Sequence, residues 1–554
     1  MHISQVPTHT THSTTRSNMA GANHKVGELL HHTPRSSTAV VVKERVAQWR
    51  RALAGRFWPR VGSLLVHVAY FLAVSWLGYL LLAQLRFRGE RTRRPRGIDL
   101  FFTAVSAATV SSMSTVEMEV FSNGQLLVLT VLMLVGGEVF LSLIGLASKW
   151  SKLRKQAAHK SRRVEIHHVA ELEMPPAAAA DIDNPTSTAD DETSKPLEHV
   201  PDTRLRRDAV RSLFFVVLAI LLAVHVLGAG AIAAYILHAS PAARRTLRDK
   251  ALNVWTFAVF TTVSTFSNCG FMPTNENMAV FQRDTGLQLL LVPQVLVGNT
   301  LFAPLLAVCV RAAAAATRRV ELKETLKQGR ELTGYGHLLP ARRCGMLAAT
   351  VAGFLAVQVA MLCGMEWSGA LRGMSSWEKV SNAVFLAVNS RHAGESTLDI
   401  STLAPAILVL FVLMMYLPPY TTWFPFEGRS STKDHPEEAR GTGLIKSTVL
   451  SQLSYLAISV IAICVTEREK LKEDPLNFNL LSIVVEVVSA YGNVGFSMGY
   501  SCSRQISPDQ LCTDRWTGFV GRWTDSGKLI LILVMLFGRL KKFSMKGGRA
   551  WKLS

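Results

Sequence analysis

The sequence has few charged residues for its length, and it lacks the motifs of a catalytic or zinc-binding domain. Asp, Glu, Lys and Arg make up 18% of the 554 residues, whereas soluble domains carry about a quarter. No P-loop, GxSxG or HExxH pattern occurs, so we expect neither enzyme activity nor a cofactor. The seven cysteines include no CxxC pair and no zinc-like Cys/His spacing, which argues against a structural zinc site.

Apolar residues take the place of the missing charge. They make up 49% of the chain, the mean hydropathy is +0.23, and they gather in runs of about 20 residues, as in integral membrane proteins. The formal net charge of +20 does not require a nucleic acid partner. Cytosolic flanks of membrane helices collect Lys and Arg, and no nucleic-acid recognition motif accompanies the charge.

One pattern recurs four times along the chain. An apolar run is followed by a segment of small and polar residues, too polar and too short to span a membrane, and then by a second apolar run. The four units occupy residues 61–150, 211–313, 345–426 and 447–549. We therefore predict an all-α polytopic membrane protein with four helix–pore loop–helix repeats, eight transmembrane helices in all, around one central pore.

The segments outside the repeats are polar and are predicted to be cytosolic. They are an N-terminal tail (1–60), a disordered linker (151–210), two connectors (314–344 and 427–446) and a short C-terminus (550–554). An even number of spanning helices places both termini on the same side, and their basic flanks place that side in the cytosol. The six arginines of Arg86–Arg96 argue the other way, because this topology puts them outside.

The four pore segments align on one small residue. They read SSMST around Ser114, SNCGF around Gly270, RHAGE around Gly394 and GNVGF around Gly495. Four such loops around an axis can present backbone carbonyl oxygens that replace the hydration shell of a cation. Glycine suits this position because it adopts the required dihedral angles cheaply. Ser114 breaks the ring, so we expect an asymmetric filter that favours Na⁺ over K⁺.

These segments resemble the plant HKT cation transporters of the Trk/Ktr/HKT superfamily. The resemblance rests on SSMSTVEMEVFSN, STFSNCGFMPTNENM, NSRHAGESTLDIS, SAYGNVGFSMGYSC and GRLKKFS, and covers residues 61–554 apart from the linker near 151–205. It implies a filter of Ser114, Gly270, Gly394 and Gly495, with the serine typical of the sodium-selective subfamily 1. It also implies passive sodium transport across a plant plasma membrane, sodium retrieval from xylem sap, salt tolerance, and a homodimer in membrane lipid with one pore per chain.

Several polar residues lie where they would line the path below the filter. Arg539 is predicted to face the path with Glu138 as its partner, although it also fits the start of the cytosolic tail. Asn299 follows a glycine at a comparable depth. Pro418 and Pro419 interrupt the second helix of the third repeat. In the superfamily this interruption serves as a gate, and a plain helix end is the alternative.

Four acidic residues follow the filter positions, and we expect them to face the outer vestibule, where acidic rings attract cations. They are Glu117, Glu119, Glu395 and Asp399. Each can instead pair locally with a base or cap a helix. Arg391 lies beside the third filter residue, and we expect it to brace that loop from behind through hydrogen bonds.

The sequence leaves open whether two neighbouring cysteines are bonded. Cys502 and Cys512 lie close together in a polar outer loop and either form a disulfide or remain free thiols.

The main functional hypothesis is a sodium-selective, channel-like uniporter. The alternatives are a Na⁺/K⁺ or proton-coupled symporter, which Ser114 argues against, and a non-conducting membrane scaffold, which the three glycines argue against.

Overall fold

The computed structural model describes residues 65–88, 94–172, 203–422, 452–506, 512, 514 and 518–544. Helices supply nearly all the regular structure in this part of the chain, and residues from Val66 onward form one compact unit. The predicted tail (1–60), the connector 427–446 and the C-terminus 550–554 lie outside the described residues.

The predicted repeat is present four times, each time as a first apolar helix, a short buried helix and a second apolar helix. Repeat one contains the helix Leu65–Gln84, α2 (Gly97–Ala108), α3 (Asn123–Gly136) and α4 (Glu138–Leu172). Repeat two contains α5 (Thr203–Ala234), α7 (Val254–Ser267), α8 (Thr285–Gly298) and α9 (Phe302–Thr317). Repeat three contains α11 (Ala341–Glu366), α12 (Ser376–Asn389) and α13 (Pro405–Tyr416). Repeat four contains α15 (Gln452–Thr466), α17 (Leu480–Gly492) and α18 (Asp525–Ser544).

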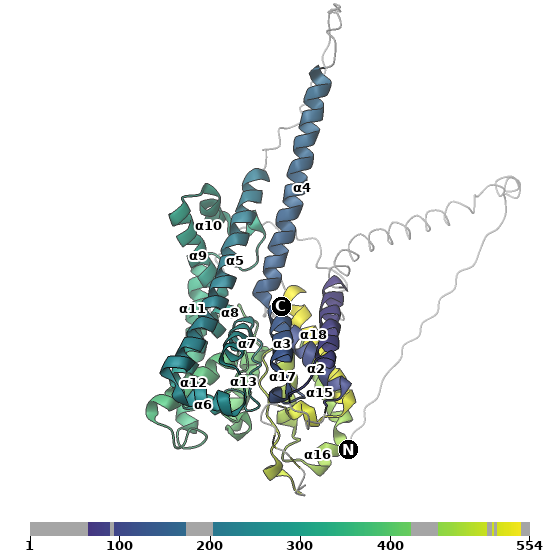
Figure 1. Cartoon of the computed structure of the whole chain (residues 1–554), viewed down its shortest axis with the longest axis vertical. Coiled ribbons are helices and arrows are strands. Elements are labelled where there is room, and N and C mark those ends of the chain that lie inside the picture. The colour runs from purple at the N-terminus through teal and green to yellow at the C-terminus, as the bar shows by residue number, and fades with distance from the viewer. Residues whose placement is uncertain are drawn as a thin grey trace, which may run out of the picture. The chain divides into compact units, whose positions relative to one another are not determined.

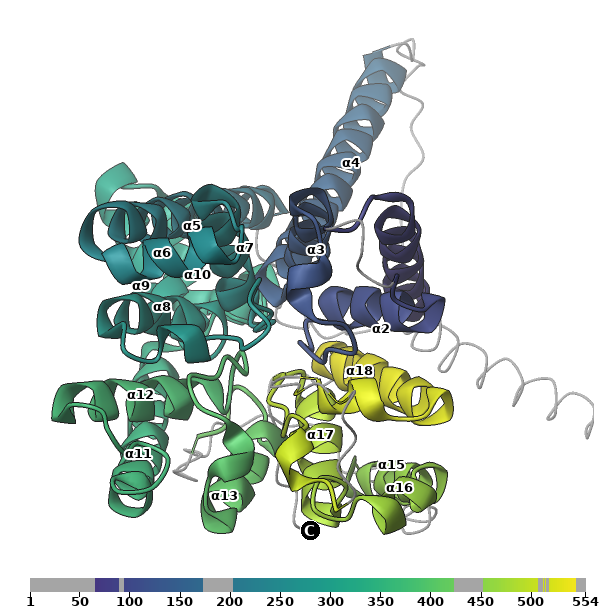
Figure 2. The same ribbon diagram turned by 60° about the horizontal axis from the view of Figure 1, so that its bottom comes forward.

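The four repeats lie around a common centre, in chain order (Figure 2). The short helices α2, α7, α12 and α17 are the most buried elements, and phenylalanines such as Phe102, Phe257 and Phe385 pack between them and the second helices. Apolar side chains on the outer faces are instead exposed, and Val226 and Leu227 on α5 are 68% and 70% exposed. A packed centre inside an apolar exterior is the arrangement expected of a protein surrounded by lipid.

Several helices are long and apolar enough to cross a membrane, which confirms the polytopic fold class. Three of them do so unbroken: Leu65–Gln84, Arg204–Ala239 and Ala341–Glu366. Two more spans are bent pairs, because α3 and α4 meet at 57° and α8 and α9 at 82°. The shorter helices α13 and α15, and α18 with its charged end, occupy the corresponding places in repeats three and four.

The second helices of repeats one and two are broken, which the apolar runs of the sequence did not indicate. The first break falls at Gly137, and the second falls between Gly298 and Phe302. Asn299 there has φ −136° and ψ −95°, far from helical values. Long apolar runs flank both breaks, so average hydropathy did not reveal them.

The predicted linker 151–210 is helical at both ends, which corrects its assignment as disordered there. Helix α4 continues to Leu172, and α5 begins at Thr203 (Figure 1). Lys, Arg, Glu and Ala are good helix formers even without an apolar period. The connector 314–344 also folds, because α10 (Val320–Thr333) packs against α5 and α9.

Candidate functional site

Each short helix ends in an extended segment, and the four segments meet at the centre. Gly270, Gly394 and Gly495 lie in these segments with φ of +91°, +71° and +106°, a region that glycine adopts most easily. A Cβ atom on Gly270 would overlap the carbonyl oxygen of Ala393, and one on Gly394 would overlap that of Val494. Each glycine therefore packs against the carbonyl just before the glycine of the next repeat.

The ring closes through Ser112, not through Ser114. A Cβ on Gly495 would overlap the Ser112 side chain and would lie 3.1 Å from the carbonyl oxygen of Ser111. Ser111 thus takes the place that precedes the ring residue, and Ser112, with φ +52°, takes the ring position itself. Ser114 instead donates a hydrogen bond from Oγ to the carbonyl oxygen of Val116 at 2.5 Å.

The backbone hydrogen bonds of the loops give the same register. In three repeats the residue before the ring position donates its N–H to a carbonyl five residues earlier. These bonds are Ser111 to Ser106 (2.8 Å), Cys269 to Ser264 (2.9 Å) and Val494 to Ser489 (3.0 Å). Because they precede Ser112, Gly270 and Gly495, the three loops superpose on those residues.

Close packing of the second helices on the short helices also aligns Ser112 with Gly270 and Gly495. A Cβ on Gly136, Gly298 or Gly538 would overlap the carbonyl oxygen of Ala108, Phe266 or Tyr491, respectively. Each of those carbonyls lies four residues before Ser112, Gly270 or Gly495 (112−108, 270−266, 495−491). Gly136, not Gly137, is therefore the counterpart of Gly298, and Glu138 is displaced by one residue from Asn299 and Arg539.

Hydroxyl groups of the short helices hold the ring backbone. Ser264 Oγ accepts a hydrogen bond from the Gly270 N–H at 3.1 Å, and Ser489 Oγ accepts one from the Gly495 N–H at 3.0 Å. These ring N–H groups thus point back toward the short helices. Carbonyl oxygens of the same segments are then suited to line the path and to bind a small cation in place of its water.

A cavity of about 760 Å³ lies on the side of the ring where the second helices break. Four predicted pore residues line it together: Glu138, Asn299, Pro418 and Pro419. Arg539 itself is buried, and its Nη2 donates to the carbonyl oxygen of Gly136. The cavity wall beside it is formed by Gly538 and Lys541. Glu138, the predicted partner of Arg539, instead lies on the cavity wall.

Arg391 connects the ring to the interrupted helix of repeat three. Its Nη2 donates to the carbonyl oxygens of Pro418 at 2.6 Å and Pro419 at 3.4 Å, and its guanidinium lies over the ring of Phe354. The side chain is only 7% exposed. The loop that carries Gly394 is therefore tied directly to the backbone that the two prolines free from helical hydrogen bonding.

The connector between repeats two and three also reaches the cavity, which sequence reasoning did not foresee. The Nδ1 atom of His337 lies 2.6 Å from the hydroxyl of Tyr420, just after the two prolines. Its Nε2 atom lies 3.9 Å from Glu138 on α4. The connector thus joins the broken helix of repeat one to the proline segment of repeat three.

Comparison with known proteins identifies the family. The cation transport proteins described as TrkH match residues 202–552. The probable cation transporter HKT1;4 of Oryza sativa subsp. japonica is 72% identical over 507 residues, covering 91% of this chain and 99% of the relative. The chain belongs to the plant HKT family of the Trk/Ktr/HKT superfamily. It is therefore a cation transporter of the membrane and not an enzyme.

Other HKT proteins and one solved structure are also similar. The sodium transporter HKT1 of Arabidopsis thaliana is 45% identical over 477 residues, covering 83% of this chain and 90% of the relative. The crystal structure of the potassium transporter TrkH from Vibrio parahaemolyticus aligns with a TM-score of 0.46 at 15% identity, covering 87% of this chain and 83% of that one.

Two carboxylates of this HKT protein lie buried behind the ring. Glu395 was expected to face the outer vestibule, but it is fully buried and accepts a hydrogen bond from Thr265 Oγ1 at 2.7 Å. Glu486, which sequence reasoning missed, is also fully buried and accepts from Ser497 Oγ at 2.6 Å and from the Met498 N–H at 2.9 Å. A lone carboxylate within an apolar segment was the signal that could have revealed it.

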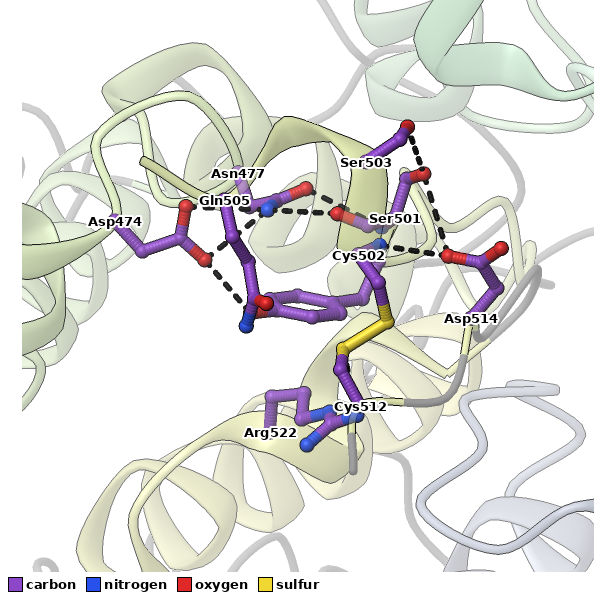
Figure 3. Close-up of a disulfide and its surroundings, with 10 residues drawn as sticks. Asp474, Asn477, Ser501, Cys502, Ser503, Gln505, Cys512, Asp514 and Arg522 are labelled. Atoms are coloured by element: carbon purple, nitrogen blue, oxygen red, sulfur yellow. Dashed lines mark hydrogen bonds between the residues drawn. A yellow bond between two sulfur atoms is a disulfide. The ribbon is translucent and has the colours of Figure 1, made fainter. Parts of the chain in front are cut away.

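The outer loop of repeat four is closed by a disulfide between Cys502 and Cys512 (Figure 3). Asp514 accepts the Cys502 N–H at 2.6 Å. The neighbouring Arg504 reaches repeat three, where it lies 3.5 Å from Asp399. Asp399 therefore takes the alternative role considered for it, a local ion pair between the outer loops of two repeats.

Proposed function

We propose that this HKT protein is a sodium-selective, channel-like uniporter that moves Na⁺ passively along the path through the ring. The observation that carries the proposal is Ser112, which completes a ring whose other three members are glycines. Its side chain lies between the glycines of repeats two and four, with Oγ at 3.4 Å and 3.0 Å from the positions that Cβ atoms on Gly270 and Gly495 would take. The hydroxyl breaks the symmetry of the ring and tightens it, which favours a small cation.

Relatives support sodium as the main ion. One is named a sodium transporter, and others are named cation transporters. A coupled symporter needs a second ion to move in fixed ratio with sodium, and a scaffold needs no conduction at all. The three ring glycines packed against neighbouring carbonyls favour conduction over a scaffold role.

Voltage clamp of oocytes that express the chain tests this proposal. External Na⁺ and K⁺ are varied separately, and the reversal potential is measured. A potential that follows external Na⁺ and ignores K⁺ supports the uniporter. A potential that follows both ions supports coupling or poor selectivity, and no current above that of water-injected cells supports the scaffold.

The physiological proposal follows the family. We place the protein in the plasma membrane with both termini cytosolic, as a homodimer with one pore per chain, and assign it sodium retrieval from xylem sap under salinity. Plants without the protein should then accumulate more shoot sodium on saline medium. Unchanged shoot sodium would contradict this role without affecting the transport proposal.

A further inference from the structure

One ammonium group ties together the outer loops of repeats one and two. Lys250 lies just after α6 (Pro241–Asp249), and its Nζ atom is 2.5 Å from Glu119 and 2.7 Å from Glu276. Glu119 follows the ring segment of repeat one, and Glu276 follows that of repeat two. The Lys250 side chain is 17% exposed, so the cluster is partly shielded from water.

The cluster lies at the outer mouth of the ring. Glu276 lines a small cavity of about 10 Å³ together with Gly394, Ser396, Gly495 and Ser497. Two of these residues are ring glycines, and the volume is about that needed for one water molecule or small ion. A cation at the outer end of the ring therefore passes close to the Glu276 carboxylate.

The position of Lys250 is fixed from several sides. Arg88 Nη1 donates to the Lys250 carbonyl oxygen at 3.1 Å. Glu119 and Asn275 exchange two hydrogen bonds, one from the Glu119 N–H to Asn275 Oδ1 at 3.0 Å and one from the Asn275 N–H to Glu119 Oε1 at 3.1 Å. Burial lowers the pKa of Lys250, but its bonds to Glu119 and Glu276 outweigh burial and raise the pKa. The ammonium therefore stays charged at neutral pH.

We propose that Lys250 limits the supply of cations to the ring by offsetting one of the two carboxylate charges at its outer mouth. This inference rests on the proposed function, since it assumes that cations enter between the pore loops. With Lys250 present, the cluster of Glu119, Glu276 and Lys250 carries one net negative charge. Without it the cluster carries two, and the local concentration of monovalent and divalent cations rises.

The test compares Lys250→Gln with Lys379→Gln under voltage clamp at low external sodium and low ionic strength. Lys379 is a matched control, because it lies near the start of the short helix α12 and its ammonium contacts the carbonyl oxygen and the ring of Trp367, away from Glu119 and Glu276. We expect Lys250→Gln to raise the inward current about threefold to fivefold per molecule at the surface. The gain should vanish at high salt, which screens the added charge. External Ca²⁺ should also block the variant at lower concentration.

Two further variants keep the test decisive if Lys250→Gln reaches the surface poorly. Lys250→Arg keeps the charge and should conduct like the unmodified protein. Glu276→Gln leaves Glu119 and Lys250 with no net charge between them and should lower the current by a similar factor. Currents equal to those of Lys379→Gln in every variant, with normal surface protein, would overturn the inference. If the unmodified chain gives no cation current, the proposed function itself fails, which is a distinguishable result.

Discussion

The register of the ring predicts opposite results for two serines that lie two residues apart. Ser112→Gly removes a side chain that lies between Gly270 and Gly495. It also replaces an L-residue at φ +52°, a conformation that costs about 1–2 kcal/mol for residues other than glycine. This variant should therefore fold at least as well as the unmodified protein and carry four glycines in its ring. Ser114→Gly removes only a local hydrogen bond to Val116, worth about 1 kcal/mol.

The assay is the shift in reversal potential when K⁺ replaces Na⁺ outside the cell. If the loss of one ligand or steric contact changes the free-energy difference between K⁺ and Na⁺ in the ring by about 1.4 kcal/mol, the ratio of K⁺ to Na⁺ permeability changes roughly tenfold. We expect a change of this size for Ser112→Gly and none for Ser114→Gly. Surface protein is measured for each variant, so that a smaller current is not mistaken for a change in selectivity.

The reverse pattern would refute the reasoning. If Ser114→Gly admits K⁺ and Ser112→Gly does not, the ring residue of repeat one is Ser114, as the spacing of the motifs first indicated. If both variants keep the unmodified selectivity, the serine does not determine the ion, and the proposal of sodium selectivity loses its physical basis.

Three further substitutions test the packing around the ring. Gly270→Ala places a methyl group onto a neighbouring carbonyl oxygen and should lower the stability of the protein by about 1–3 kcal/mol or more. The current per surface molecule should fall, and a normal current would show that the ring is loosely packed. Arg391→Gln removes a charged hydrogen bond to Pro418, worth about 1.5–3 kcal/mol, and should raise single-channel open probability; an unchanged value would argue against a gating role for the prolines. Lys528→Met removes the ammonium that lies 2.7 Å from the Asp99 carboxylate, which keeps only its ion pair with the exposed Arg96, and should destabilise the protein by about 1.5–3 kcal/mol. A melting temperature equal to that of the unmodified protein in detergent would contradict this.

Much of the architecture could be predicted from the sequence, because hydropathy and small polar segments recur in the same order. Gly270, Gly394 and Gly495 were recognisable because their backbone conformation strongly favours one residue type. The fourth member was not, since the segment VSSMST offers serines at both 112 and 114. The left-handed turn at Val110, with φ +51°, sets the register, and a β-branched residue gives no warning of such a turn.

Other features depended on contacts between distant segments. Glu395 follows a ring glycine and looked exposed, yet its partner Thr265 comes from the neighbouring repeat. Arg539 was expected at the path, yet it is buried and donates to the carbonyl oxygen of Gly136, at the end of α3 in another repeat. His337 lies in a polar connector, and only the fold of α10 brings it to Tyr420. Hydropathy gives no information on such contacts between residues that are far apart in the chain.

The measurement that tests the central claim most directly uses the purified chain in a planar lipid bilayer. Gradients of Na⁺, K⁺ and protons are imposed one at a time, with no other protein present. The account predicts a current whose reversal potential follows the Na⁺ gradient and ignores the other two. A reversal potential that moves with the K⁺ or proton gradient, or flux that requires two ions together, would contradict passive sodium transport through this ring.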